Sequence, residues 1–228
     1  SEDYFVSRRV DRSGLFLGAY TYDYRKLREQ TALAEKKEIR RVHGIPEKSF
    51  VFLFVGKLIP GRRVGDLLRA FEKTEPDELR LIIVGDGEDK NTVDAAAARD
   101  ERIISVPEVD LDHLYEYLVM ADVYVHPGKE PYSCAVMQAA AAGLPVISTD
   151  AVGAADDFLK DGQNGKIFTY GDVDAMCKAM LDVYENIDVF RQYAKEAQKY
   201  VCENLSTDHA AGQLFEAVSH AAGKRSGR

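Results

Sequence analysis

Residues 130–147 place an acidic loop residue, a helix start and a helical amide close together. Glu130 precedes an Ala-rich helical segment that opens near Ser133, and Gln138 lies about a turn and a half into it at roughly 3.6 residues per turn. The first N–H groups of a helix have no partner within it and carry a partial positive charge, so they can bind a phosphate. A carboxylate beside such a site can reach a sugar hydroxyl. This arrangement suits a nucleoside diphosphate-sugar.

Short apolar runs on both sides of this segment indicate where it lies in a fold. Residues 122–126 and 144–148 are rich in β-branched residues and have the length of buried parallel strands. The helix between them therefore begins at the carboxyl end of a strand. Ligands bind at that edge of open α/β sheets, so we expect Glu130 to face a binding cleft.

The same alternation of apolar runs and helical patterns extends along most of the chain. Strands are predicted at 51–55, 80–84, 103–106, 122–126, 144–148 and 166–168. Helices are predicted between them at 64–73, 89–99, 111–120, 133–142 and 154–160, and after them at 173–186, 189–204 and 208–222. This order predicts an α/β fold, a Rossmann-like doubly wound parallel sheet of about six strands with flanking helices.

The two ends of the chain lack this alternation. Residues 1–23 are expected to be irregular, and residues 24–43 to form one highly charged helix with Leu27, Leu33 and Ile39 turned inward. The last residues, 223–228, are expected to fray.

The composition excludes some classes of function. The 228 residues are 46% hydrophobic, which is enough for a substantial core. The net charge of -8 and the lack of a basic stripe argue against nucleic-acid binding, which needs cations to displace the counterions of the phosphate backbone.

The cysteines and the N-terminus indicate a compartment. Cys134, Cys177 and Cys202 are an odd number with neither metal-ligand spacing nor a disulfide pattern, which fits a reducing cytosol. Residues 1–9 lack the apolar core of a signal peptide, and no run of about 18 apolar residues occurs. We expect a soluble, cytoplasmic protein without a metal site.

The segment Glu130-Pro-Tyr-Ser-Cys-Ala-Val-Met-Gln138 resembles the signature of retaining glycosyltransferases of the GT-B type, family GT4. In that signature an acidic residue, seven further residues and a second acidic residue precede an Ala/Gly-rich turn; here Gln138 replaces the second acid. Segments 52–62, 81–87, 121–127 and 161–165 follow in the order that the family shows. The resemblance covers about two thirds of the chain, roughly residues 50–205.

The resemblance implies roles for an acid and two cations. Glu130 would be the catalytic residue that faces the donor sugar and places its anomeric carbon. Lys57, which follows Gly56 after the first strand, and Arg62, which opens the next helix, would grip the diphosphate, with the two residue types exchanged relative to the family. Arg offers a planar fork and Lys a point charge, so the charge is kept and the geometry is not. The alternative for such residues is a solvated basic loop.

Further positions would complete the donor site. The segment around Tyr132, Ser133 and Cys134 would present helix N–H groups to the phosphates. The amide of Gln138 would bind the ribose hydroxyls, as acceptor and as donor. Backbone groups at Val109 would contact the nucleobase, which leaves the base undetermined. No metal or other cofactor is implied beside the nucleoside diphosphate-sugar.

A GT-B enzyme has two Rossmann-like domains with the active site between them, whereas this chain predicts one sheet. By resemblance, residues 1–23 are a linker from a first domain, 24–205 the nucleotide-sugar-binding domain, and 206–228 a C-terminal helix and tail. The acceptor would bind to the absent N-terminal domain, and the full-length protein could associate peripherally with a membrane. A natural single-domain protein is the alternative.

Two functions therefore stay open. One is the donor half of a retaining glycosyltransferase, favoured by Glu130, Lys57 and Arg62. The other is a catalytically degenerate nucleotide-binding module, favoured by Gln138. A related choice concerns His126, at a strand end, which either faces the same cleft or packs in the core.

Overall fold

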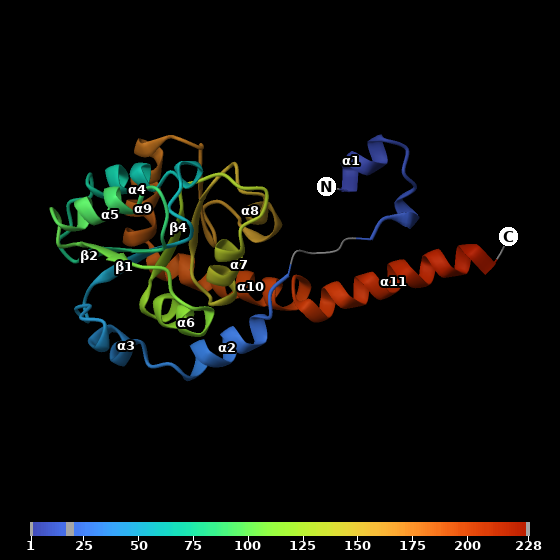
Figure 1. The fold of residues 1–228 in the computed structure, drawn as a ribbon, viewed down its shortest axis with the longest axis horizontal. Helices are drawn as coiled ribbons and strands as arrows, with labels where there is room; N and C mark the ends of the chain where they lie inside the picture. The colour runs from blue at the N-terminus through green and yellow to red at the C-terminus, as the bar shows by residue number, and fades with distance from the viewer. Residues whose placement is uncertain (1, 17–20, 227–228) are drawn as a thin grey trace.

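The computed structural model describes residues 2–16 and 21–226 and contains one six-stranded parallel sheet (Figure 1). The strand order is β3-β2-β1-β4-β5-β6. The strands are β1 (Phe50–Val55), β2 (Leu79–Val84), β3 (Ile103–Val106), β4 (Val123–His126), β5 (Val146–Thr149) and β6 (Gly165–Phe168). This order is that of the doubly wound Rossmann fold, so the predicted fold class is confirmed.

Helices cover both faces of the sheet. One face carries α4 (Val64–Phe71), α5 (Lys90–Ala97) and α9 (Val173–Glu185). The other carries α2 (Tyr24–Leu33), α6 (Leu111–Met120), α7 (Cys134–Ala141) and α8 (Gly153–Phe158), and α10 (Ile187–Asn204) contributes to both. Successive residues of β1 alternate between these two layers, with Val51 and Leu53 in one and Phe52 and Phe54 in the other. Burial on both faces explains why β1 is apolar throughout.

The strand order reverses between β1 and β4. The chain runs outward from β1 to β3, returns to the centre as β4, and then runs outward on the other side to β6. Loops that leave adjacent central strands toward opposite sides leave a crevice at the strands' carboxyl ends, where α/β proteins bind ligands.

The charged segment before β1 forms two helices, so the prediction of one helix over 24–43 was wrong. α2 ends at Leu33, Ala34 is extended, and α3 runs from Lys36 to Val42. Leu33 is 86% exposed, whereas Leu27 and Ile39 pack on the core as predicted. After the break, α3 places Lys36 and Arg40 at the amino end of the sheet.

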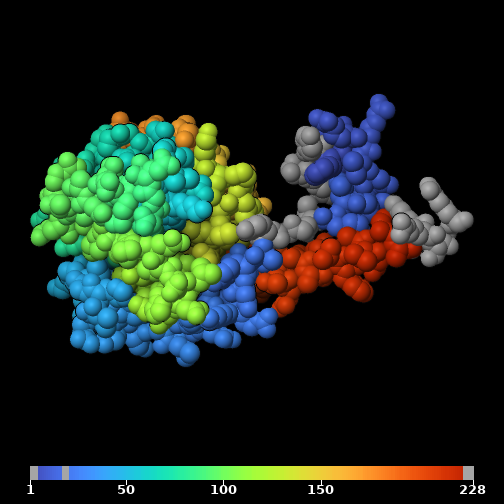
Figure 2. Space-filling model, in the orientation of Figure 1, coloured from blue at the N-terminus to red at the C-terminus, as the bar shows by residue number. Residues whose placement is uncertain are grey.

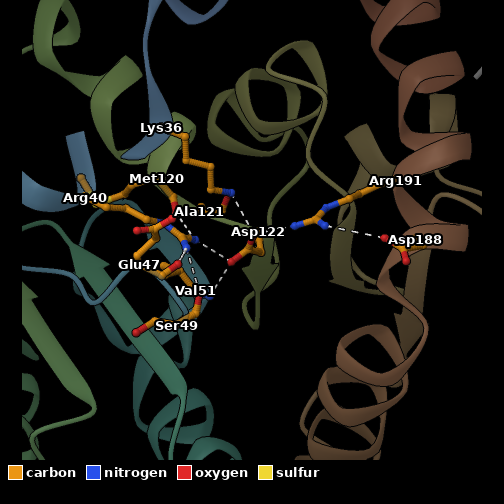
Figure 3. A network of polar contacts seen from close by, with 10 residues as sticks. All are labelled: Lys36, Arg40, Glu47, Ser49, Val51, Met120, Ala121, Asp122, Asp188 and Arg191. Atoms are coloured by element: carbon orange, nitrogen blue, oxygen red, sulfur yellow. Dashed lines mark hydrogen bonds and ion pairs between the residues drawn. The ribbon is translucent and has the colours of Figure 1, made fainter. Parts of the chain in front are cut away.

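At that end Asp122, which immediately precedes β4, forms ion pairs with three basic side chains (Figure 3). Its side chain is 5% exposed. Lys36, Arg40 and Arg191 lie 2.8, 2.7 and 2.6 Å from its oxygens, and the Val51 N–H donates to it over 2.8 Å. The contacts tie α3, β1, β4 and α10 together.

Arg40 also donates hydrogen bonds to backbone carbonyl oxygens around this cluster. It donates to Met120 O at 2.9 and 2.7 Å and to Ser49 O at 2.8 Å. Burial alone would raise the pKa of Asp122, but Lys36, Arg40 and the Val51 N–H outweigh it and hold that pKa below its usual value.

The chain ends also differ from expectation. The opening residues contain a helix, α1 (Glu2–Ser7), and a 3-10 turn at Arg12–Gly14, where Asp11 accepts from the Ser13 N–H. The last helix, α11 (Thr207–Ser226), continues beyond 222 into the segment expected to fray. It projects from the body formed by the sheet and its helices (Figures 1 and 2). Within 2–16 and 21–226, no helix combines the length and apolarity that crossing a membrane requires.

Candidate functional site

A cavity of about 200 Å³ opens at the carboxyl ends of β1 and β2. It brings together four residues that the sequence placed in one site: Gly56, Lys57, Val109 and Gln138. The other lining residues are Val55, Val84, Gly85, Asp86, Glu108, Leu111 and Leu114. The floor is therefore apolar and the mouth charged, which suits a flat, partly apolar group that carries charge at one end.

The loops after β1 and β2 touch at the mouth of this cavity. Gly85 has φ +154°, and a Cβ there would lie 2.0 Å from Gly56 O. The Leu58 N–H donates to Asp86 O over 2.8 Å. This contact fixes the turn that carries Lys57, whose exposed side chain lies at the cavity.

Gln138 approaches from α7. It is 6% exposed, and among the described residues no hydrogen bond engages its side-chain amide. Because this amide lines the cavity and has no partner among the described residues, it is available to a ligand that enters.

Glu130 lies in the loop after β4, at the same carboxyl edge of the sheet; like Arg62, Ser133 and Cys134, it does not line the cavity itself. Its N–H donates to Ala151 O over 3.2 Å, and the Gly153 N–H donates to Glu130 O over 3.3 Å. These two bonds tie the backbone of Glu130 to the loop after β5. The side chain is therefore presented from a braced segment.

Arg62 forms an ion pair with Glu130. Arg62 ends a 3-10 turn (Pro60–Arg62) after β1, and its Nη1 also donates to Lys129 O over 3.2 Å. Gly128 permits the approach of the two loops, since a Cβ there would lie 2.7 Å from the Arg62 Cα. The sequence indicated both Arg62 and Glu130 but not their contact.

His126 is the last residue of β4, and its ring reaches the same carboxylate. His126 Nε2 lies 3.3 Å from Glu130 Oε1, with a side chain that is 2% exposed. The Tyr124 hydroxyl lies 3.4 Å from His126 Nδ1 and 3.1 Å from Val55 O. Burial, followed by the charge of Arg62, lowers the pKa of His126 to about 3. Both sequence alternatives hold in part, because the imidazole is buried and one nitrogen faces the site.

The start of α7 has the predicted helix geometry. Ser133 is buried and caps the helix, accepting from the Val136 N–H over 3.4 Å. Cys134 is exposed at the first helical position. In the described part of the chain no carbonyl or side chain accepts from the Cys134 or Ala135 N–H, so both stay available to an anion.

Tyr132 and Arg63, which are near the candidate site in sequence, make contacts within the protein. Tyr132 does not line the cavity; it packs on the core, where burial and Asp157 raise its pKa to about 12. Arg63 pairs with Asp66 and lies 5.0 Å over the ring of Tyr170. Among the described residues, no group of three or more His, Cys, Asp or Glu is placed to hold a metal ion.

The sequence matches a known family over most of its length. A model described as "Glycosyl transferases group 1" matches residues 35–200. The alpha-monoglucosyldiacylglycerol synthase of Acholeplasma laidlawii is 29% identical, over 72% of this chain and 45% of that protein. The phosphatidyl-myo-inositol mannosyltransferase of Mycobacterium leprae is 30% identical, over 65% of this chain and 41% of that protein. The chain thus spans about half the length of the curated relatives it matches.

Solved structures share the fold. HepE of Anabaena, solved in complex with UDP, superposes with a TM-score of 0.79 at 19% identity, over 96% of this chain and 61% of that one. Sucrose-phosphate synthase of Thermosynechococcus elongatus superposes with a TM-score of 0.77 at 21% identity, over 96% and 57%. At such identities the likeness concerns the fold alone.

Proposed function

Because the chain belongs to the glycosyl transferases group 1 family, we propose that it is the donor-binding domain of a retaining glycosyltransferase that uses a nucleoside diphosphate-sugar. The observation that carries this proposal is the contact of Arg62 with Glu130, which lies at the same carboxyl edge of the sheet as the cavity. It joins a cation suited to a diphosphate with a carboxylate suited to a sugar. In a nucleoside diphosphate-sugar the diphosphate is bonded directly to the sugar, so the groups that bind these two parts must lie next to each other.

The nucleoside would occupy the cavity. Its base would lie on the apolar floor near Val109, and its ribose near the amide of Gln138. The diphosphate would then extend toward Lys57, Arg62 and the start of α7, where cations and unpaired N–H groups combine. HepE, whose fold is shared, was solved with UDP and with UDP-glucose, which supports a ligand of this class.

Glu130 would hold the sugar hydroxyls so that the anomeric carbon faces the acceptor. The negative charge that develops on the leaving diphosphate would be stabilised by Lys57, Arg62 and the helix start without a metal. In a retaining transfer the leaving diphosphate can itself accept the proton of the acceptor hydroxyl. Glu130 is then a positioning and electrostatic group at the sugar.

The acceptor, a polysaccharide, a lipid or another hydroxyl compound, would bind outside this chain, on an N-terminal domain. The share of each relative that the chain spans supports this division. The free thiols of Cys134, Cys177 and Cys202 support a reducing, cytoplasmic setting. Peripheral membrane association belongs to the same proposal for the full-length protein.

A degenerate binding module is the second candidate, and Gln138 in place of an acid favours it. Titration of the chain with UDP, GDP and ADP, and with their glucose or mannose conjugates, tests both. We expect weak binding of at least one diphosphate and no sugar transfer, because half of the catalytic cleft would be missing. Transfer by the chain alone would contradict the domain assignment, and binding to none of these ligands would contradict both candidates.

A further inference from the structure

We propose that His126 is a positioning residue for Glu130. The neutral imidazole of His126 donates its Nε2–H to the Glu130 carboxylate, while its Nδ1 accepts from the Tyr124 hydroxyl. The value of this contact for catalysis rests on the proposed role of Glu130. The contact itself is a property of the protein without ligand.

The placement of His126 leaves little freedom to the ring. It ends β4 and is packed beside the rings of Phe54 and Tyr124, with centroids 6.1 and 6.3 Å away. Within the described residues Nε2 is buried without a well-aligned hydrogen bond, and Glu130 Oε1, at 3.3 Å, is the acceptor beside it. A buried polar atom that lacks a partner is unfavourable, so a small rotation that completes the bond is expected.

Counting protons reduces the choice to two hydrogen-bonded arrangements. The Tyr124 hydroxyl has one proton and two acceptors in reach, Val55 O at 3.1 Å and His126 Nδ1 at 3.4 Å. If that proton points to Val55 O, Nδ1 has a partner only when it carries the imidazole proton, and the Nε2 lone pair then faces a carboxylate. If it points to Nδ1, Nε2 carries the proton and donates to Glu130.

Electrostatics favours the second arrangement. A lone pair held 3.3 Å from a carboxylate oxygen in a buried site is repelled, whereas an N–H in the same place forms a charge-assisted hydrogen bond. Protonation of both nitrogens is opposed by burial and by Arg62, which lower the pKa of His126. The donor is therefore a neutral N–H throughout the physiological pH range.

The arrangement gives Glu130 two anchors of different kinds. Arg62 holds Oε2 from a loop, and His126 holds Oε1 from a strand end. A diphosphate competes for Arg62 but does not reach the buried imidazole. When Arg62 turns to the ligand, His126 keeps the carboxylate oriented.

The test is long-range ¹H–¹⁵N NMR of the histidine rings in the whole chain, with the His126 signals assigned by their loss in His126→Gln. In the wild type we expect the Nε2–H tautomer near pH 7. In Glu130→Ala we expect a shift of population toward the Nδ1–H tautomer, because the charge that selects Nε2–H is gone. Glu108→Ala removes a carboxylate elsewhere in the site and should leave the tautomer unchanged.

A wild-type Nδ1–H tautomer overturns the proposal, as does an unchanged tautomer population in folded Glu130→Ala. Tyr124→Phe supplies an independent check: the Nε2–H should persist while the Nδ1 resonance moves to the position of a nitrogen without a donor. An Nδ1 resonance that does not move would overturn the proposed role of Tyr124. Because no measurement uses a nucleotide, failure here is distinguishable from failure of the proposed function, which the ligand titrations report.

Discussion

Arg62 and Glu130 follow different strands of the sheet, yet their side chains form an ion pair at its carboxyl edge. The cation proposed to bind the diphosphate is thus paired with the carboxylate proposed to bind the sugar. A phosphate that binds Arg62 must replace this partner. The affinity gained from Arg62 is therefore the difference between two charge-assisted contacts.

Replacing Lys57 and Arg62 together by Ala should weaken diphosphate binding by several kcal/mol at most. Each charge-assisted bond contributes about 1.5 to 3 kcal/mol, and the contribution of Arg62 is reduced by the contact it gives up. Binding of the nucleoside without phosphate should hardly change. Calorimetric titration with both ligands measures the difference, and Lys37→Ala, at an exposed pair with Glu47, is the control. Equal losses for the two ligands would indicate damage to the fold.

Glu130→Gln should leave diphosphate affinity intact or slightly increased, because Arg62 loses its competing anion. In the full-length protein the same change should depress turnover, since Glu130 is proposed to hold the sugar in its reacting geometry. Binding constants and steady-state rates measure the two effects. Unchanged turnover would remove Glu130 from the mechanism and favour the binding module.

Gln138→Glu should strengthen nucleotide binding by about 1 kcal/mol at most, because a charged acceptor forms a stronger hydrogen bond with ribose hydroxyls than an amide does. Position 138 is 6% exposed, so the new carboxylate should also lower the stability of the ligand-free chain. Gln138→Met, similar in size and without polar hydrogen-bonding groups of comparable strength, should weaken nucleotide binding. Titration combined with denaturant unfolding separates the two effects. Tighter nucleotide binding by Gln138→Met would contradict a contact with the ribose.

Asp122→Asn should lower the free energy of unfolding by about 3–5 kcal/mol at neutral pH, the usual cost of leaving buried charges unpaired. The folded-state pKa of Asp122 lies below its unfolded value. The stabilisation is therefore complete above the unfolded pKa, about 3.9, and is lost as the pH falls through the lower folded pKa. Urea unfolding at several pH values should show the wild type and the variant converging only in that acidic range.

A matched control is Asp174→Asn, which removes an exposed partner of Lys73. Its effect should be small at every pH, because solvent screens surface pairs. A loss as large as that of Asp122→Asn would mean that burial does not set the strength of the Asp122 cluster.

Local sequence patterns were sufficient to predict the parallel sheet and the helices between its strands. Runs of β-branched residues predicted the strands. The predicted helix at 111–120 coincides with α6, because its apolar residues recur at helical spacing and Asp110 marks its start. The break between α2 and α3 was not predicted, since no Pro or Gly marks it. The break accompanies the ion pair of Lys36 with Asp122, a contact between segments distant in sequence.

The candidate site divides in the same way. Residue types and strand-end positions indicated Glu130, Lys57 and Arg62. The ion pair of Arg62 with Glu130, and the approach of His126 to the same carboxylate, depend on how separate loops pack. Gly128 was the available signal: the close approach of the two loops leaves no room for a side chain there.

Strand β4 carries the Asp122 cluster before its first residue and His126 at its last, with Glu130 in the loop beyond. At about 3.3 Å per residue, the four residues of β4 set a fixed distance between its amino end, anchored by Asp122, and its carboxyl end, which carries His126. Deleting one residue of β4 would shift His126 toward the amino end of the sheet and turn its side chain to the opposite face. Pairing with β1 on one side and β5 on the other holds the strand between these two ends. The position of Glu130 relative to Arg62 thus depends on the length of β4 as well as on the loops that carry the two residues.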